Sequence, residues 1–121
     1  MTTRAKGPKG KADALFSRLI RSRGACEKCG STDFLQAAHI ITRSRLNTRW
    51  DTRNAWCLCA GCHIRLTHWP VEHRDFAWQT IGEETYYELV RLSESTTKVW
   101  RKSDFEAECR QIQTALDVWA A

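Results

Sequence analysis

Two Cys-x-x-Cys pairs constrain the fold of this 121-residue chain more than any other feature. Cys26 and Cys29 form the first pair, and Cys59 and Cys62 form the second. Four thiolates can surround one ion tetrahedrally, an arrangement that suits Zn²⁺ and leaves no open coordination position for catalysis. We therefore predict a structural zinc site. The thirty positions from Cys29 to Cys59 exceed the ~15–20 of a simple zinc ribbon, so a substantial unit must be inserted between the pairs.

The sequence also carries expectations about the cellular compartment. The N-terminus, MTTRAKGPKGK, has no apolar segment of the kind found in secretory signals, and no run of ~18 apolar residues predicts a membrane span. We therefore expect a cytoplasmic protein without membrane contact, whose thiols stay reduced and serve as metal ligands or core residues. The two remaining cysteines, Cys57 and Cys109, are expected to be buried core residues.

The net charge of +5 is distributed unevenly along the chain. Residues 1–53 carry twelve Lys and Arg against four Asp and Glu, whereas residues 54–121 carry seven against ten. A basic half beside a metal site favours a polyanionic partner, most simply nucleic acid. A basic surface that only confers solubility is the alternative, and the charge alone does not decide between the two.

Hydrophobic periodicity and turn residues predict an α+β fold in a single domain. Residues 1–10 are expected to form a disordered basic arm, and residues 11–121 the domain, with its core over 26–70 and C-terminal helices over 71–121. We expect helices over 11–23, 70–79 and 83–92, a helix opening around Cys59, strands over 34–41 and 55–58, and a polar loop over 42–53.

The last helix carries the clearest local signals. Ser103-Asp-Phe-Glu106 matches a capping box, in which the two outer side chains satisfy the first free N–H groups of a helix. We interpret the apolar stripe that follows as a packing face without chemistry; its members are Phe105, Cys109, Ile112, Leu116 and Trp119.

The insertion between the cysteine pairs contributes three polar residues at a characteristic spacing. His39 ends the first expected strand as Ala-His39-Ile, Asn54 follows in the pair Arg-Asn54, and His63 directly follows the second cysteine pair. With these motifs the chain resembles the HNH endonucleases, the ββα-metal or His-Me finger family, over roughly residues 26–70.

The resemblance implies both a fold and an activity. The fold would be a ββα-metal finger clamped by the four-Cys zinc site, with α-helices flanking it on the N- and C-terminal sides. The longer pattern TRWD-x-x-N over residues 48–54, with Pro70 downstream, is most similar to small HNH proteins of bacteriophages, among them recombination endonucleases. The activity would be metal-dependent hydrolysis of DNA phosphodiester bonds, by nicking or cutting, in a bacterial or phage-infected cell.

The resemblance also implies a role for each residue. His39 would be the general base that takes a proton from the attacking water, a task that suits an imidazole with an ordinary pKa of ~6.5. Asn54 would hold the loop around His39 by bonding to the main chain, and His63 would bind a catalytic divalent cation, Mg²⁺ or Mn²⁺. Four loop arginines would grip flanking phosphates of the DNA: Arg43, Arg45, Arg49 and Arg53.

The residue before the predicted general base departs from the family pattern. Many relatives place a metal-ligating Asp or His there, where this chain has Ala38. Asp51 and His68 are the candidates for a second ligand; a salt-bridged Asp51 and a surface His68 are the alternatives. Five residues on a helix turn through ~140°, so His68 would share a face with His63 poorly. We expect His73 to be a surface residue.

Two other functions remain open from the sequence. A zinc-stabilised DNA-binding module, such as a recombination accessory factor, would bind DNA without cleaving it and would be expected to lack part of the His/Asn/His set. A redox protein using Cys-x-x-Cys would need a reactive thiol of low pKa. Because all three residues of the set are present, the sequence favours the endonuclease. We expect DNA as the partner, a monomer or weak homodimer, and no strong site specificity, since no helix has an obvious base-reading face.

Overall fold

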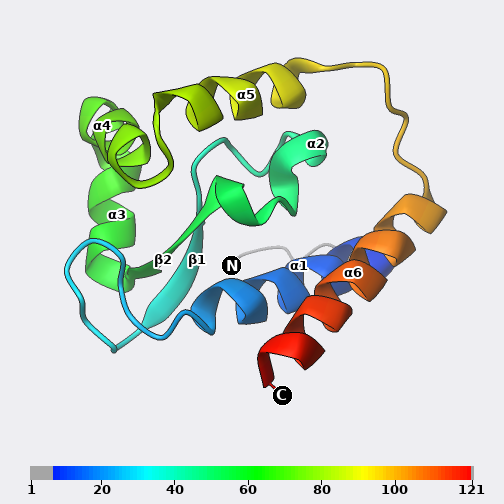
Figure 1. Ribbon diagram of the computed structural model, residues 1–121, viewed down its shortest axis with the longest axis horizontal. Coiled ribbons are helices and arrows are strands. Elements are labelled where there is room, and N and C mark those ends of the chain that lie inside the picture. The colour runs from blue at the N-terminus through cyan, green and yellow to red at the C-terminus, as the bar shows by residue number, and fades with distance from the viewer. Residues whose placement is uncertain (1–6, 121) are drawn as a thin grey trace.

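The computed structural model describes residues 7–120, and within them six α-helices surround a two-stranded antiparallel sheet (Figure 1). The predicted α+β class is therefore confirmed. In chain order the elements are α1 (Gly7–Arg21), β1 (Leu35–His39), α2 (Leu46–Arg49), the 3₁₀ turn η1 (Thr52–Asn54), β2 (Ala55–Cys59), α3 (Ala60–His68), α4 (Pro70–Ile81), α5 (Glu83–Glu94) and α6 (Lys102–Ala120).

The two strands form a sheet whose faces define the two halves of the core. β1 and β2 pair in register, with Ala38 opposite Trp56 and His39 opposite Ala55. Side chains alternate along a strand, and paired residues project to the same side of the sheet. Ala38 and Trp56 therefore face one side, and His39 and Ala55 face the other.

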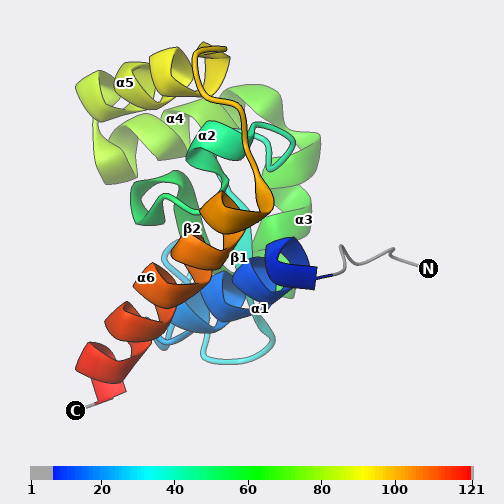
Figure 2. The ribbon, with the colours of Figure 1, turned by 90° about the vertical axis from the view of Figure 1, so that its right-hand side faces the viewer.

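The His39 face is covered by α1 and α6, which lie side by side in both ribbon views (Figures 1 and 2). The predicted apolar stripe of α6 is half-buried at Phe105 and buried from Cys109 to Leu116, but Trp119 is 67% exposed. The buried residues of this half are Ala12, Leu15, Phe16, Ile20, Trp50, Ala55, Cys57, Cys109, Ile112 and Leu116.

The opposite face is covered by α3 and α4, and Trp56 lies at its centre. The Trp56 ring contacts that of Phe76 with centroids 5.0 Å apart, and its indole N–H donates to Thr80 Oγ1 at 2.8 Å. Because the ring is apolar and its one polar atom finds a partner on α4, its burial holds α4 against the sheet. The buried residues of this half are Cys26, Ala38, Ile40, Trp56, Leu58, Leu66, Phe76 and Ala77.

A connector over residues 95–101 joins α5 to α6 along one side of the molecule (Figure 1). Asn47 on α2 fixes its position: Nδ2 donates to the carbonyls of Leu92 at 3.0 Å and Ser95 at 2.7 Å. Oδ1 of the same amide accepts from the indole N–H of Trp100 at 2.8 Å. One side chain thus ties α2 to both ends of the connector.

The N-terminal boundary and the loop differ from the predictions. α1 begins at Gly7, so residues 7–10 of the predicted basic arm are helical, while its first six residues lie outside the described part of the chain. The predicted loop over 42–53 contains α2 and the start of η1. The side chain of Asp51 caps η1 by accepting from the N–H of Arg53 at 2.9 Å, a local bond that favours a tight turn.

The predicted capping box of the last helix is wrong. α6 begins at Lys102, so Ser103 lies inside the helix and cannot cap it. Asp104 instead reaches back, and its Oδ2 accepts from the N–H of Arg101 at 2.9 Å. Across the described residues, none of the helices combines the length and apolarity that a membrane crossing requires.

Candidate functional site

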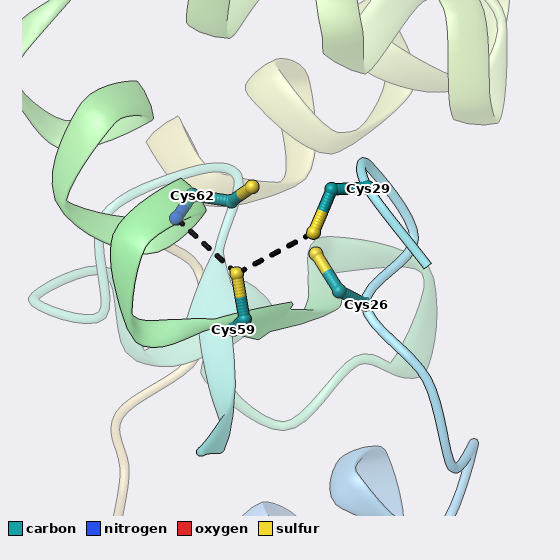
Figure 3. Close-up of side chains that lie close together, drawn as sticks. All are labelled: Cys26, Cys29, Cys59 and Cys62. Carbon is teal, nitrogen blue, oxygen red and sulfur yellow. Dashed lines mark hydrogen bonds between the residues drawn. The ribbon is translucent and has the colours of Figure 1, made fainter. Parts of the chain in front are cut away.

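The first cysteine pair lies in a tight turn between α1 and β1. The N–H of Gly30 donates to the carbonyl of Cys26 at 2.9 Å, and the N–H of Cys26 donates to the carbonyl of Ser31 at 2.7 Å. Gly30 has a φ of +81°, a conformation that L side chains rarely adopt. The turn brings the sulfurs of Cys26 and Cys29 next to each other (Figure 3).

The second pair lies where β2 turns into α3. Cys59 is the last residue of β2 and the N-cap of α3, and its Sγ accepts a hydrogen bond from the N–H of Cys62 at 3.5 Å. This local bond places the first turn of α3 directly after the strand. The junction therefore presents two sulfurs to those of the first pair (Figure 3).

The four sulfur atoms form one cluster and all lie within 4.8 Å of one another. The sulfurs of Cys29 and Cys59, which belong to different pairs, are 3.6 Å apart. A tetrahedral ion with Zn–S bonds of ~2.3 Å would need sulfurs about 3.8 Å apart. All four cysteines are free thiols, not disulfides. The cluster is thus compatible with a metal site, and a set of four thiolates suits zinc.

The ionisation of the sulfurs also favours a bound cation. Burial raises the pKa of Cys26, but hydrogen bonds from the main chain of Cys29, Cys59 and Lys28 outweigh burial and bring the pKa down to about 6. Burial and the neighbouring sulfurs raise the pKa of Cys62 to about 12. Four thiolates this close repel one another, so all of them can ionise together only around a positive ion.

The other two cysteines lie outside the cluster. Cys57 is fully buried in β2, and Cys109 is buried on α6 with its Sγ 3.2 Å from the carbonyl oxygen of Pro8. Burial raises the pKa of both thiols. Their prediction as core residues is confirmed.

His39, at the end of β1, is held on two sides. Its ring stacks on that of Phe16 with centroids 5.7 Å apart, and Nε2 donates to the carbonyl of Arg49 at 2.8 Å. A carbonyl oxygen can only accept, so the neutral ring carries its proton on Nε2 and its lone pair on Nδ1. Burial lowers the pKa of His39 below 6.5, the hydrogen bond to Arg49 opposes this, and the charges of Arg43 and Arg49 lower it further. His39 is therefore neutral near pH 7, with Nδ1 able to accept a proton.

Asn54 is fully buried and bonds to the main chain on both sides of the loop. Its Oδ1 accepts from the N–H of Ile41 at 2.7 Å, and its Nδ2 donates to the carbonyls of Ile41 at 3.1 Å and Thr48 at 3.0 Å. Thr48 directly precedes Arg49, whose carbonyl holds the ring of His39. Asn54 thus braces the loop around His39.

His63 projects from the first half of α3. Its Nδ1 lies 2.7 Å from Oε1 of Gln36 on β1 and donates to that oxygen, so the lone pair of the neutral ring is on Nε2. Burial lowers the pKa of His63. An imidazole with one nitrogen fixed by a second group and the other carrying a lone pair is the usual form of a metal-ligating histidine.

A cavity of about 330 Å³ brings the predicted histidines together. We call it the histidine cavity, because His39, His63 and His73 line it, together with Ala38 and other residues of the sheet, α3 and α4. A second cavity of about 500 Å³ on the α1 side shares His39 and His63 and also includes Arg43. The candidate base and the candidate cation ligand therefore face shared space.

His73 is a further residue of this cavity, and the sequence did not single it out. The prediction of a surface residue is wrong, because His73 is half-buried and its ring packs edge-on against Trp56 with centroids 4.9 Å apart. Burial lowers the pKa of His73, and a hydrogen bond with the main chain of His39 opposes this. The sequence offers one signal, a histidine in the first turn of the helix that Pro70 opens, but that signal does not say that α4 folds back over the sheet.

The two candidates for a second cation ligand lie elsewhere. Asp51 caps η1 and forms an ion pair with Arg53 at 2.8 Å. His68 is exposed in the last turn of α3. Neither residue lines the histidine cavity. The structure therefore has the salt-bridged Asp51 and the surface His68 that were the alternatives to ligation.

The four loop arginines occupy different environments. Arg49 is only 6% exposed, and its guanidinium makes two hydrogen bonds to Asp13 of α1, at 2.9 and 2.6 Å. Arg53 is paired with neighbouring acidic side chains. Arg43 and Arg45 are exposed, and Arg43 lies beside the second cavity. Arg49 therefore holds α1 to the loop. The prediction that it contacts a DNA phosphate is wrong, because its guanidinium is buried and already bonded to Asp13.

Comparisons of the chain with models of protein families, with curated protein sequences and with solved structures return no match. A functional assignment therefore rests on the residues and geometry described above.

Proposed function

We propose that this chain is a metal-dependent DNA endonuclease of the HNH type, in which β1, β2 and α3 form a ββα-metal finger. The observation that carries the proposal is the arrangement around His39. The Arg49 carbonyl fixes its ring, Asn54 braces its loop, and His63 lines the same cavity. In this proposal the four cysteines hold a structural zinc ion that secures the finger.

Hydrolysis of a phosphodiester requires an activated water and stabilisation of the charge that develops on the phosphate and the leaving 3′ oxygen. His39 meets the first requirement, because Nδ1 can accept the proton of the water while the Nε2–H stays bonded to the Arg49 carbonyl. That bond keeps the ring from turning and also stabilises the imidazolium that forms. The lowered pKa keeps the base in its neutral, reactive form at pH 7.

His63 would hold the divalent cation through Nε2, while Gln36 fixes its ring from the other side. Mg²⁺ or Mn²⁺ is the proposed ion, and when bound it supplies charge stabilisation to the scissile phosphate and the departing oxygen. Arg43, which is exposed beside the second cavity and also pairs with Asp13 at 3.2 Å, would contact a neighbouring phosphate, and Arg45 is exposed on the same loop.

The test is cleavage of supercoiled plasmid by the zinc-loaded protein with Mn²⁺ or Mg²⁺. We expect His39→Ala to lower the cleavage rate by about 10²-fold or more, because the general base is lost. His68→Ala, a histidine outside the cavity, is the matched control and should cleave normally. An EDTA control is also needed, but the histidine variants are decisive because a chelator can strip the structural zinc as well.

Absence of cleavage by the unsubstituted protein with every divalent metal tested, or full activity of His39→Ala, would refute the proposal. DNA binding without cleavage, unchanged in His39→Ala, would instead identify a zinc-stabilised DNA-binding module.

A further inference from the structure

The histidine cavity contains a third imidazole that the proposed mechanism does not use. His73 lines the cavity from α4, and His63 lines it from α3, the helix immediately before. Among the described residues no carboxylate lines this cavity, whose polar side chains are histidines and threonines. Its strongest donors for a cation are therefore ring nitrogens.

The residue at position 38 explains why a ring from α4 can reach this space. Ala38 pairs with Trp56 across the sheet, so both side chains project toward α3 and α4. Ala38 ends at its Cβ and offers no donor, while His73 packs edge-on against Trp56 on the same face. Ala38 and His73 line the same cavity, to which the short residue on β1 supplies no donor and the residue on α4 supplies an imidazole.

The three imidazoles differ in which ring nitrogen remains free to bind a cation. The Nε2–H of His39 is committed to the Arg49 carbonyl, and its remaining nitrogen is the proposed proton acceptor. His63 keeps Nε2 after its Nδ1 bonds to Gln36. His73 bonds to the main chain of His39 through one ring nitrogen and keeps the other. His63 and His73 are therefore the pair left to bind an ion.

We propose that His63 and His73 together form a two-imidazole site for a transition-metal cation, with His73 supplying the second ligand. The role of this ion in cleavage rests on the proposed function, but its binding does not. Imidazole donors suit transition metals better than Mg²⁺, and the affinity of such sites rises from Mn²⁺ through Co²⁺ to Ni²⁺. The cavity is therefore expected to bind Ni²⁺ most tightly of these ions and Mg²⁺ most weakly.

The binding test uses the full chain with zinc already in the four-Cys cluster, titrated with Mn²⁺ by calorimetry. His73→Gln is expected to weaken Mn²⁺ binding by about tenfold or more. His68→Gln makes the same substitution at an exposed histidine outside the cavity and is expected to leave the affinity unchanged. Wild-type affinity in His73→Gln would overturn the proposal.

A second measurement needs no variant and so decides the matter even if His73→Gln fails to fold. A diamagnetic cation, Zn²⁺ added beyond the one equivalent held by the cysteines, changes the ¹⁵N chemical shift of an imidazole nitrogen strongly only when that nitrogen coordinates it. We expect one ring nitrogen of His63 and one of His73 to shift together while those of His68 do not. A His73 ring whose nitrogens stay unshifted while His63 responds would overturn the second ligand, and no shift at either ring would overturn the site altogether.

Plasmid cleavage by the same samples separates this site from the proposed function. If His73→Gln binds Mn²⁺ and cleaves as the unsubstituted protein does, the site is refuted and the endonuclease stands. If Mn²⁺ binds through His73 and no sample cleaves DNA, the site stands and the endonuclease is refuted.

Discussion

Replacement of Asn54 by alanine is expected to destabilise the protein strongly, because three hydrogen bonds inside the fold lose their partner. Thr48 is fully buried, so water cannot reach the carbonyl that Asn54 leaves behind, which costs about 1–3 kcal/mol. The two bonds to the half-buried main chain of Ile41 are worth about 0.5–1.5 kcal/mol each. The free energy of unfolding should therefore fall by about 2–6 kcal/mol, a large part of the about 5–15 kcal/mol that stabilises a typical domain.

The assay is urea unfolding of the zinc-loaded protein, followed by far-UV circular dichroism. Asn47→Ala is a matched control, because the Asn47 amide also makes three hydrogen bonds, two of them to exposed partners. Water can replace the hydrogen bonds that the Asn47 side chain makes to its exposed partners, so Asn47→Ala should lower the free energy of unfolding by only about 1–2 kcal/mol. A loss below about 1 kcal/mol for Asn54→Ala, or one equal to that of Asn47→Ala, would refute the reasoning that burial sets the value of this brace.

The variant Asn54→Asp tests whether the N–H donors of the Asn54 side chain, and not only its size, stabilise the fold. The variant keeps the size of the side chain but places an oxygen where Nδ2 now donates to two carbonyls. A buried carboxyl group in these surroundings resists ionisation, so its folded-state pKa would lie above the unfolded value. The deficit in stability should then shrink as the pH falls, because protonation restores a donor.

Chelation of zinc should unfold the cysteine-bound unit, with loss of the circular dichroism signal and recovery when Zn²⁺ returns; a native signal after chelation would contradict the structural role. Because burial lowers the pKa of His39, the unfolded chain takes up a proton more readily, so stability should fall as the pH drops below about 6.5. His39→Gln should flatten that part of a stability-versus-pH curve, and an unchanged slope would argue against it. Arg49→Lys loses the two-pronged bond to Asp13 and should cost about 1.5–3 kcal/mol in urea unfolding, whereas a neutral result would show that the pair is dispensable. Arg43→Ala should leave stability within about 0.5 kcal/mol but reduce the salt slope of DNA binding by about 1, and an unchanged slope would exclude a phosphate contact.

Much of the fold could be predicted because its signals are local. Pro70 opens α4, and the apolar spacing of α6 is buried as far as Leu116. Both features depend on backbone geometry and on residues within a turn or two of each other. The start of α6 was harder to predict, because Asp104 and Glu106 are both acidic residues that can reach back three positions to a main-chain N–H, and the two alternatives differ by only two residues.

The loop arginines show where local signals fail. Composition groups Arg43 and Arg49 as one basic loop, and both guanidinium groups pair with Asp13, at 3.2 and 2.6 Å, yet Arg43 is exposed and Arg49 is buried. Asp13 is thirty-six positions away from Arg49 along the chain and becomes its partner only when α1 packs against the sheet. Charge alone therefore cannot separate an exposed arginine from one that is buried and holds the fold.

The sequence by itself determined the four-Cys set and the motif of His39, Asn54 and His63, because both are recognised from the identity of the residues and their spacing along the chain. Only the tertiary structure decided that His73 joins the histidine cavity. That position depends on the direction in which α4 turns after α3, and α4 packs on the sheet through the contacts of Trp56 with His73, Phe76 and Thr80. These are long-range packing preferences, and no local pattern along the chain encodes them.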